Sequence, residues 1–386
     1  MVRADQLSRR RMLQTVAAGS AVGIAGCTGP SGTGGGPADE ISFPELGEFR
    51  GSGPLVEGRP APGGTSIQDL PNLDGELTLY IGGGEGGIYY SFVEKLEEIY
   101  PNFDAKISTA SSSSLAQTIV EEVEAGASQA DLFWSIDASS LAFVTNNDAY
   151  EPLSSDAVGP VPSEFTGADN AWVGVAGRAR SIPYNTEVYS EDDIPNKVQR
   201  IPDTDGLPGA MGWAPSYGAF KSFVTAMRLL KGEETTRQWL TSMSEAGIQQ
   251  YPDEFVVSNR VADGAIDAGF ANHYYALRVK NNRPDAPLDL AFTNGDAGAL
   301  VNVAGALKIK GTQKGDLVDT FVRHLLSAEA QEFFTTVSFA YPMIPEVAPP
   351  GDLPTIDELN PPEIELSKLS ELAATLDLMR SAGVLG

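Results

Sequence analysis

The chain has 386 residues, and its hydrophobic fraction of 42% is sufficient for the core of one large or two medium domains. It carries 52 acidic against 26 basic residues, a net charge of −26, which excludes nucleic acid as a natural partner. Such an acidic surface is typical of proteins that stay soluble in very high salt, where charge repulsion is screened. We therefore expect an extreme halophile. A surface that concentrates cations is the alternative.

Residues 1–26 are predicted to be a twin-arginine lipoprotein signal. Ser8-Arg9-Arg10-Arg11-Met12-Leu13 matches the twin-arginine export pattern, and the apolar stretch Met12–Ile24 leads to Gly26 and Cys27. A transmembrane anchor is the alternative, but the apolar stretch is shorter than the roughly 20 residues that span a bilayer. Cys27 is the only cysteine, so no intramolecular disulfide or cysteine metal site is possible. We expect a lipid on Cys27 to hold the mature protein on the extracytoplasmic face of the cell membrane.

Residues 27–75 are rich in Gly, Pro and Ser and are predicted to be a flexible tether. The folded body is expected to begin near Glu76, where hydrophobic patterns of strand and helix start to alternate. The predicted strands are Glu76–Ile81, Asp104–Ser108, Asp131–Trp134, Trp172–Val175, Ser181–Tyr184, Ala265–Phe270 and Leu300–Leu307. The predicted helices are Ile88–Tyr100, Leu115–Ala125, Lys221–Leu230, Glu234–Ala246, Asp316–Leu326, Ala328–Phe334 and Glu363–Ser381. This alternation predicts an α/β fold with largely parallel sheets.

Several motifs occur in one order along the chain. They are Ala130-Asp131-Leu132-Phe133-Trp134, Gly177-Arg178-Ala179-Arg180 with Tyr184-Asn185-Thr186, Gly212-Trp213-Ala214-Pro215, Asn272-His273-Tyr274-Tyr275, Asn294-Gly295-Asp296 and Leu326-Ser327-Ala328-Glu329-Ala330-Gln331. From about Leu77 to the C-terminus the chain thereby resembles the ferric-iron-binding family of ABC transporter solute-binding proteins, in the form of a haloarchaeal-like lipoprotein.

The resemblance implies a periplasmic-binding-protein type 2 fold, in which two α/β lobes are joined by two crossing strands and bind ligand in the cleft between them. Lobes of this size suit the chain length. Lobe 1 is expected to comprise residues 76–176 with about 300–345, and lobe 2 residues 177–299 with about 346–386.

The resemblance also implies ferric iron (Fe³⁺) as the transported ligand, with Tyr184, Tyr274 and Tyr275 as metal ligands. Fe³⁺ is a hard cation that prefers oxygen, and a bound metal favours the ionised phenol. Tyr274 and Tyr275 can reach one ion only from an irregular or helix-starting segment, because neighbours on a strand point to opposite faces. The alternative is that the tyrosine pair is simply a buried aromatic cluster, and His273 and His324 are expected to be structural.

The chain departs from the best-known family pattern at two places. Some members supply a histidine and a glutamate where this sequence has Gly84 and Ile136, whose side chains cannot coordinate a metal. A histidine–glutamate–tyrosine–tyrosine site is therefore not expected. Glu85 and Asp137 are weaker candidates, one residue away.

Carbonate or another small anion is expected to complete the iron site. Hydroxyls and free amides at helix starts favour anions, although they also serve as ordinary helix caps. Arginines can bind anions with two hydrogen bonds, although Arg178 and Arg180 could equally be strand-end charges. The candidate anion or ligand contacts are Gly83, Gly84, Ser112, Ser113, Arg178, Tyr217, Gly218, Ala219 and Asn272.

These features predict a monomeric binding lipoprotein, not an enzyme, that hands its ligand to an ABC importer permease. A binding protein of the same fold for an organic anion, a sugar or another metal is the first alternative. The second is a nucleotide-dependent enzyme, which only the glycine-rich stretch Gly82–Gly87 suggests; its G-x-G-x-x-G spacing matches many patterns. No Ser-His-Asp, Cys-His or P-loop arrangement is evident.

Overall fold

A computed structural model describes residues 41–83 and 86–385. The predicted export signal, Cys27, Gly84 and Glu85 lie outside the described residues. Within the described part of the chain, no helix is long and apolar enough to cross a membrane.

Three parallel strands open the folded body, where strand and helix patterns alternate in the sequence. β1 (Gly75–Gly82) lies between β2 (Phe103–Ala110) and β3 (Leu132–Ser135). The predicted strands and helices of this region are confirmed within a few residues. The helices around these strands are α1 (Gly86–Ile99), α2 (Ser112–Glu124), α3 (Ala138–Asn146) and α4 (Ser155–Val158), with α9 (Gly315–Leu325) and α10 (Ala328–Val337) returning from later in the chain.

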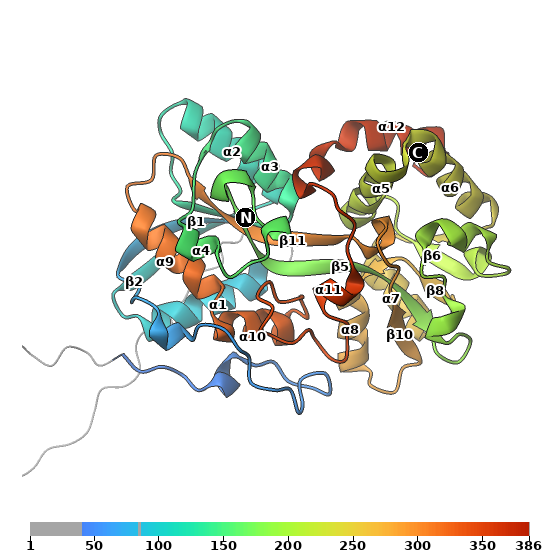
Figure 1. Cartoon of the computed structure of the whole chain (residues 1–386), viewed down its shortest axis with the longest axis horizontal. Helices are drawn as coiled ribbons and strands as arrows, with labels where there is room; N and C mark the ends of the chain where they lie inside the picture. Colours follow the sequence, from blue (N-terminus) through green and yellow to red (C-terminus); the bar gives the residue numbers. More distant parts are fainter. Residues whose placement is uncertain (1–40, 84–85, 386) are drawn as a thin grey trace, which may run out of the picture. The chain divides into compact units, whose positions relative to one another are not determined.

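Two long antiparallel strands run between the two groups of elements seen in Figure 1. β5 (Val173–Asn185) pairs through its first half with β11 (Val301–Ile309), which also pairs with β3 and with the short β4 (Tyr150–Glu151). The second half of β5 pairs with three strands of the other group. The two strands predicted at Trp172–Val175 and Ser181–Tyr184 are therefore one continuous strand, and the sheet is mixed rather than largely parallel.

The second group of elements contains the short parallel strands around β6. Strand β6 (Met211–Trp213) pairs with β7 (Gln249–Gln250) and β8 (Ala268–Gly269), while β9 (Ala271–Asn272) and β10 (Leu288–Ala291) pair with β5. Its helices are α5 (Gly218–Lys231), α6 (Glu233–Glu245), α7 (Glu254–Ala262) and α8 (His273–Asn282). This arrangement is the α/β, two-lobed periplasmic-binding-protein fold that the resemblance implied.

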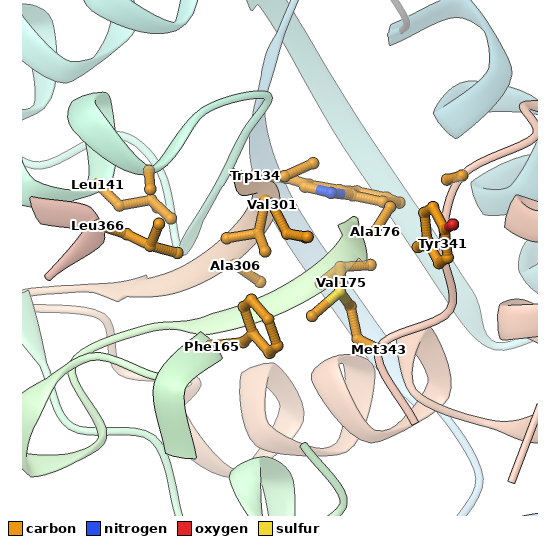
Figure 2. Close-up of a cluster of buried hydrophobic side chains, with 14 of the residues drawn as sticks. Trp134, Leu141, Phe165, Val175, Ala176, Val301, Ala306, Tyr341, Met343 and Leu366 are labelled. Carbon is orange, nitrogen blue, oxygen red and sulfur yellow. The ribbon is translucent and has the colours of Figure 1, made fainter. Parts of the chain in front are cut away.

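A buried cluster of apolar side chains surrounds the crossing strands (Figure 2). Val175 of β5 and Val301 of β11 pack there, with Tyr341 and Met343 from the segment after α10. All four side chains are almost fully buried. The crossing strands are therefore part of the core and not an exposed linker.

The prediction of a flexible tether over residues 27–75 is wrong from Ile41 onward. Phe49 and Ile67 are at most 1% exposed and belong to the main core. Arg50 and Arg59 both form ion pairs with the buried Glu332 of α10. Scattered apolar and arginine side chains hold this Gly- and Pro-rich segment against the folded body.

The single C-terminal helix predicted over Glu363–Ser381 is also wrong in part. A short helix α11 (Ile356–Leu359) comes first, followed by a 3₁₀ helix at Leu366–Ser370 and then by α12 (Leu372–Ser381). The 3₁₀ helix packs against α3, whereas α12 packs against α5 and α6. The tail therefore contacts both groups of elements.

Candidate functional site

The two adjacent tyrosines lie in the first turn of α8, so of the two settings expected, an irregular or a helix-starting segment, the structure has the helix start. Asn272 precedes the helix in an extended conformation and is held by pairing of β9 with Arg180 of β5. Tyr274 is 3% exposed and Tyr275 is partly exposed, with ring centroids 4.2 Å apart. The helix start thus directs both rings to one place.

A third phenol meets this pair from another helix. Tyr217 is the residue that precedes α5, and its hydroxyl forms a short hydrogen bond with the hydroxyl of Tyr275. The hydroxyl of Tyr274 also hydrogen-bonds to that of Tyr275. Burial, followed by the hydrogen bond to Tyr217, raises the pKa of Tyr275 well above its ordinary value. Three phenol oxygens therefore form one hydrogen-bonded chain.

A guanidinium group lies over the rings of the tyrosine pair. The Cζ atom of Arg278 is 5.1 Å from the ring centroid of Tyr274 and 6.0 Å from that of Tyr275. Arg278 follows these residues by four and three positions, so the helical repeat places it on the same side of α8. Sequence reasoning missed this residue, although its spacing from the pair was visible.

An ion pair is buried beside the start of α8. Glu254, the first residue of α7, is fully buried and accepts hydrogen bonds from Arg180 Nη1 at 2.5 Å and from Asn272 N at 2.8 Å. Arg180 Nη1 also donates to Asn272 Oδ1 at 3.2 Å. The Asn272 side chain is therefore bound to Arg180. Glu254 was also missed, because the sequence does not show that it pairs with an arginine of β5.

His273 is fully buried and has a structural role, as expected. Ala179 N donates to its Nδ1 at 3.2 Å, and its Nε2 donates to Phe339 O at 2.7 Å. Burial lowers the pKa of His273 to about 4, so the ring is neutral near pH 7. The ring connects α8 to the crossing strand β5 and to the segment after α10.

Tyr184 is not brought together with the tyrosine pair. It lies near the end of β5, opposite Asp289 of β10, and lines a separate cavity of about 610 Å³ together with Glu191. Burial, then Asp289 and Glu191, raises the pKa of its phenol. The expectation that Tyr184 binds the same ion as the pair therefore does not fit this structure, because β5 carries the residue to a cavity whose lining includes neither Tyr274 nor Tyr275.

Ser112 is also engaged elsewhere. It is 3% exposed, and its Oγ accepts a hydrogen bond from Ile136 N at 3.0 Å while lying against Gly82. Its hydroxyl therefore joins the ends of β1 and β3 instead of facing solvent. The neighbouring Ser111 caps α2 by accepting from Ser114 N at 3.1 Å, which is the capping alternative.

The remaining candidates lie at several places. Gly83 N donates to Ala110 O at 2.7 Å at the end of β1, and Ser113 is exposed in the first turn of α2. Gly218 and Ala219 form the first turn of α5, immediately after Tyr217. Arg178 is half-buried on β5 and lies close enough to His273 to lower the pKa of that ring further.

Within residues 41–83 and 86–385, no group of three or more His, Cys, Asp or Glu side chains is placed to hold a metal ion. The oxygen donors that lie together at the start of α8 are the phenol groups of Tyr217, Tyr274 and Tyr275. Phenol oxygen is a hard donor when ionised, so this group of side chains suits a highly charged, hard cation.

The family profile, the related sequences and the similar solved structures all belong to solute-binding proteins. A profile of the family described as bacterial extracellular solute-binding protein matches residues 127–364. The chain is 32% identical over 284 residues to the major ferric iron-binding protein of Neisseria meningitidis, covering 72% of this chain and 85% of the relative. It is 25% identical over 278 residues to the Fe(3+)-binding periplasmic protein of Serratia marcescens, covering 71% and 80% of the two chains. The iron-bound HitA structure from Pseudomonas aeruginosa superposes with a TM-score of 0.68 at 27% identity, covering 80% of this chain and 99% of HitA.

Proposed function

The chain belongs to the family of bacterial extracellular solute-binding proteins, and from this premise we propose that it binds ferric iron and passes it to the permease of an ABC importer. The relatives named for ferric iron support this choice of solute. The protein acts as a binding protein and carries out no chemistry on the ion.

The observation that carries the proposal is the pairing of Tyr274 and Tyr275 in the first turn of α8. Their phenol groups are hydrogen-bonded to each other, so one cation can replace the shared proton and contact both oxygens. The buried setting disfavours a charged phenolate unless a positive charge compensates it. A trivalent cation provides this compensation, and its binding releases the phenol protons.

A small anion such as carbonate, or water, occupies the remaining coordination positions. Gly218 and Ala219 are candidate donors because their backbone N–H groups lie in the first turn of α5, beside Tyr217. Gly83 and Ser113 are candidates from the carboxyl ends of the parallel strands on the other side of the crossing strands. Asn272 is bound to Arg180 and contributes mainly by holding the start of α8.

Export and anchoring complete the proposal. The twin-arginine signal in residues 1–26 directs the folded protein out of the cell, and a lipid on Cys27 retains it at the membrane as a monomer. The lobes, assigned to residues 76–176 with about 300–345 and to residues 177–299 with about 346–386, close about the ion by a hinge in β5 and β11. The net charge of −26 keeps the protein soluble in concentrated salt.

The test uses the colour of ferric iron on tyrosinate. Purified protein mixed with ferric iron and bicarbonate is expected to develop a red-orange absorption band that a strong chelator removes. Tyr274→Phe and Tyr275→Phe should each weaken the band and the affinity for iron, because each removes one ligand oxygen and keeps the ring. Tyr184→Phe is the matched control, since Tyr184 lines a cavity that includes neither tyrosine of the pair.

A protein that stays colourless with ferric iron, or Tyr274→Phe and Tyr275→Phe variants that hold iron as tightly as the wild type, would refute the iron assignment. Thermal unfolding of the apoproteins separates a lost ligand from a lost fold. An organic anion or sugar that stabilises the protein without iron would instead favour the alternative solute class.

A further inference from the structure

The cavity that Tyr184 lines lies apart from the tyrosine pair and has a lining of its own character. It encloses about 610 Å³ among β5, β10, the C-terminal half of α8 and the segment that leads into α11 (Figure 1). We propose that this cavity is a second binding site, whose ligand is a linear aliphatic diamine or polyamine. The site and its solute are distinct from those of the proposed function.

The phenol of Tyr184 is the first observation that points to a ligand. Tyr184 is 6% exposed, and within residues 41–83 and 86–385 no hydrogen bond joins its hydroxyl to another residue. It lies directly opposite Asp289 on the antiparallel strands β5 and β10, so both side chains leave the sheet on one face. Both also line the cavity, into which the phenol is therefore directed. Buried polar groups nearly always have a hydrogen-bond partner, and here the cavity has to supply it.

The charged side chains around the cavity decide the sign of the ligand. Four acidic residues and one basic residue line it, namely Glu191, Asp289, Asp352 and Glu358 against Lys280. Lys280 Nζ donates to Asp289 Oδ1 at 2.9 Å, and Leu290 N donates to the same oxygen at 2.9 Å. Among the described residues, none donates to Asp289 Oδ2. The excess of acceptors therefore favours a cation that carries several N–H donors.

The spread of the carboxylates decides the shape of the ligand. Glu191 comes from the 3₁₀ helix Glu191–Asp193, Asp289 from β10, and Asp352 from the segment before α11. In the part of the chain that the structure describes, no three His, Cys, Asp or Glu side chains converge closely enough to hold a metal ion. An elongated cation with an ammonium group at each end can contact acidic groups that are too far apart to share one ion.

Apolar side chains complete the lining. They are Leu55, Leu277, Leu290, Phe292, Leu353 and Pro354. Such a surface favours a methylene chain over the hydration shell of an inorganic cation. The cavity volume also lies in the range of small-molecule sites. An aliphatic diamine combines the two properties, because its apolar chain separates two charged ends.

These features give each end of the diamine its own partners. One ammonium group donates to the phenol oxygen of Tyr184 and to the carboxylates of Asp289 and Glu191, which both lie close enough to the phenol to raise its pKa beyond the effect of burial. The other ammonium group meets Asp352. Tyr184 is thus the residue that distinguishes a bound amine from a diffuse cloud of cations around an acidic surface.

The test is calorimetric titration with cadaverine, the linear five-carbon diamine, at fixed ionic strength. Wild type should bind one cadaverine per chain. Tyr184→Phe should weaken binding by roughly tenfold or more, as expected for loss of one hydrogen bond to a charged group. Asp352→Asn should also weaken it. Asp377→Asn is the matched control, since it removes an exposed carboxylate of α12 that does not line the cavity, and it should bind as wild type does.

A second measurement uses wild type alone and does not depend on the variants folding well. Cadaverine should bind at least about tenfold more tightly than pentylamine, which has the same chain but one ammonium group. Equal affinities of the two amines, displacement of cadaverine by Mg²⁺ at equal charge, or equal losses in Asp377→Asn and Tyr184→Phe would show mere screening of an acidic surface and overturn the site.

Ferric iron separates this site from the proposed function. Saturating ferric iron should leave cadaverine bound, because the cavity includes neither Tyr274 nor Tyr275. Competition between the two would overturn the assignment of a separate site. A wild-type protein that shows no tyrosinate band would refute iron binding but would leave the cadaverine result unchanged.

Discussion

Glu254 Oε1 and Arg180 Nη1 form a 2.5 Å ion pair whose side chains are at most 4% exposed, beside the residue that begins the tyrosine-bearing helix. Asn272 contacts both partners, through its backbone N–H and its side-chain oxygen. The pair therefore ties together β5, α7 and the start of α8. A buried charge pair of this kind stabilises a structure only while both partners are present.

Removal of one partner should therefore be costly. Glu254→Gln keeps the shape of the side chain but leaves the buried Arg180 charge uncompensated, and we expect a loss of about 3 kcal/mol in the free energy of unfolding. Denaturant unfolding of the apoprotein measures this loss. Asp377→Asn, which breaks the exposed pair with Arg380, is the control and should not change the midpoint. Equal stability of Glu254→Gln and wild type would show that the pair does not hold α8.

Arg278 should affect the proton balance of the tyrosines more than the fold. Its guanidinium lies over both rings, and a nearby positive charge favours the ionised phenol. Arg278→Gln should therefore move the pH midpoint of iron binding upward, as followed by the tyrosinate band. Lys280→Gln is the matched control on the same helix, because Lys280 pairs with Asp289 of β10. A downward shift, or an equal shift in both variants, would contradict the assigned role of Arg278.

His324 should contribute to loss of stability in acid. Its Nδ1 donates to Thr320 O at 2.8 Å and its Nε2 accepts from the Tyr100 hydroxyl at 2.8 Å, so the ring is neutral. Burial lowers its pKa from 6.5 to about 4. The unfolded chain then binds more protons between these values, so the contribution of His324 is complete above pH 6.5 and is lost as the pH falls toward 4.

The size of this effect is about 3 kcal/mol, since one pKa unit corresponds to about 1.4 kcal/mol. Denaturant midpoints of wild type and His324→Gln, measured between pH 7 and pH 4, test it. The variant should be less stable at pH 7 but should lose less stability on acidification. Parallel pH profiles of the two proteins would show that His324 does not titrate as described.

A side chain at Gly82, at the end of β1, should destabilise the fold. An added Cβ would collide with Ser112 Oγ and approach Ile136 N to 3.1 Å, so Gly82→Ala should cost about 1–3 kcal/mol in the free energy of unfolding. Gly87→Ala is the control, because among the described residues no atom outside the backbone of its own helix lies within 4 Å of the position that its methyl group would take, and helix α1 gains a better helix former. Thermal unfolding should therefore shift in opposite directions in the two variants. A neutral Gly82→Ala change would contradict the close approach.

The local elements could largely be predicted from the sequence, because periodicity reports which side of each element faces the core. The pattern in Glu76–Ile81 anticipated β1, whereas the Tyr274-Tyr275 pair left an irregular and a helix-starting segment both open. Errors arose where contacts distant in the chain decide the outcome. The Gly- and Pro-rich segment before β1 is ordered by Phe49 and by Arg50, which contacts Glu332 far along the chain.

The candidate site could be predicted only where its residues are close in the sequence. Tyr274 and Tyr275 are neighbours in sequence and therefore in space, whereas Tyr184 lies on a strand whose course away from the pair depends on its pairing with β10. The contact of Tyr217 with Tyr275 joins α5 to α8 across 58 positions and has no local signal. Glu254 resembles any helix-starting acidic residue until its arginine partner is known.

Anomalous diffraction at the iron edge from crystals of the iron-loaded protein is the decisive measurement for the tyrosine site. We expect a single strong iron peak within bonding distance of the phenol oxygens of Tyr274 and Tyr275. An iron peak elsewhere, such as among Tyr184, Glu191 and Asp289, or no ordered iron at all, would contradict binding at the start of α8.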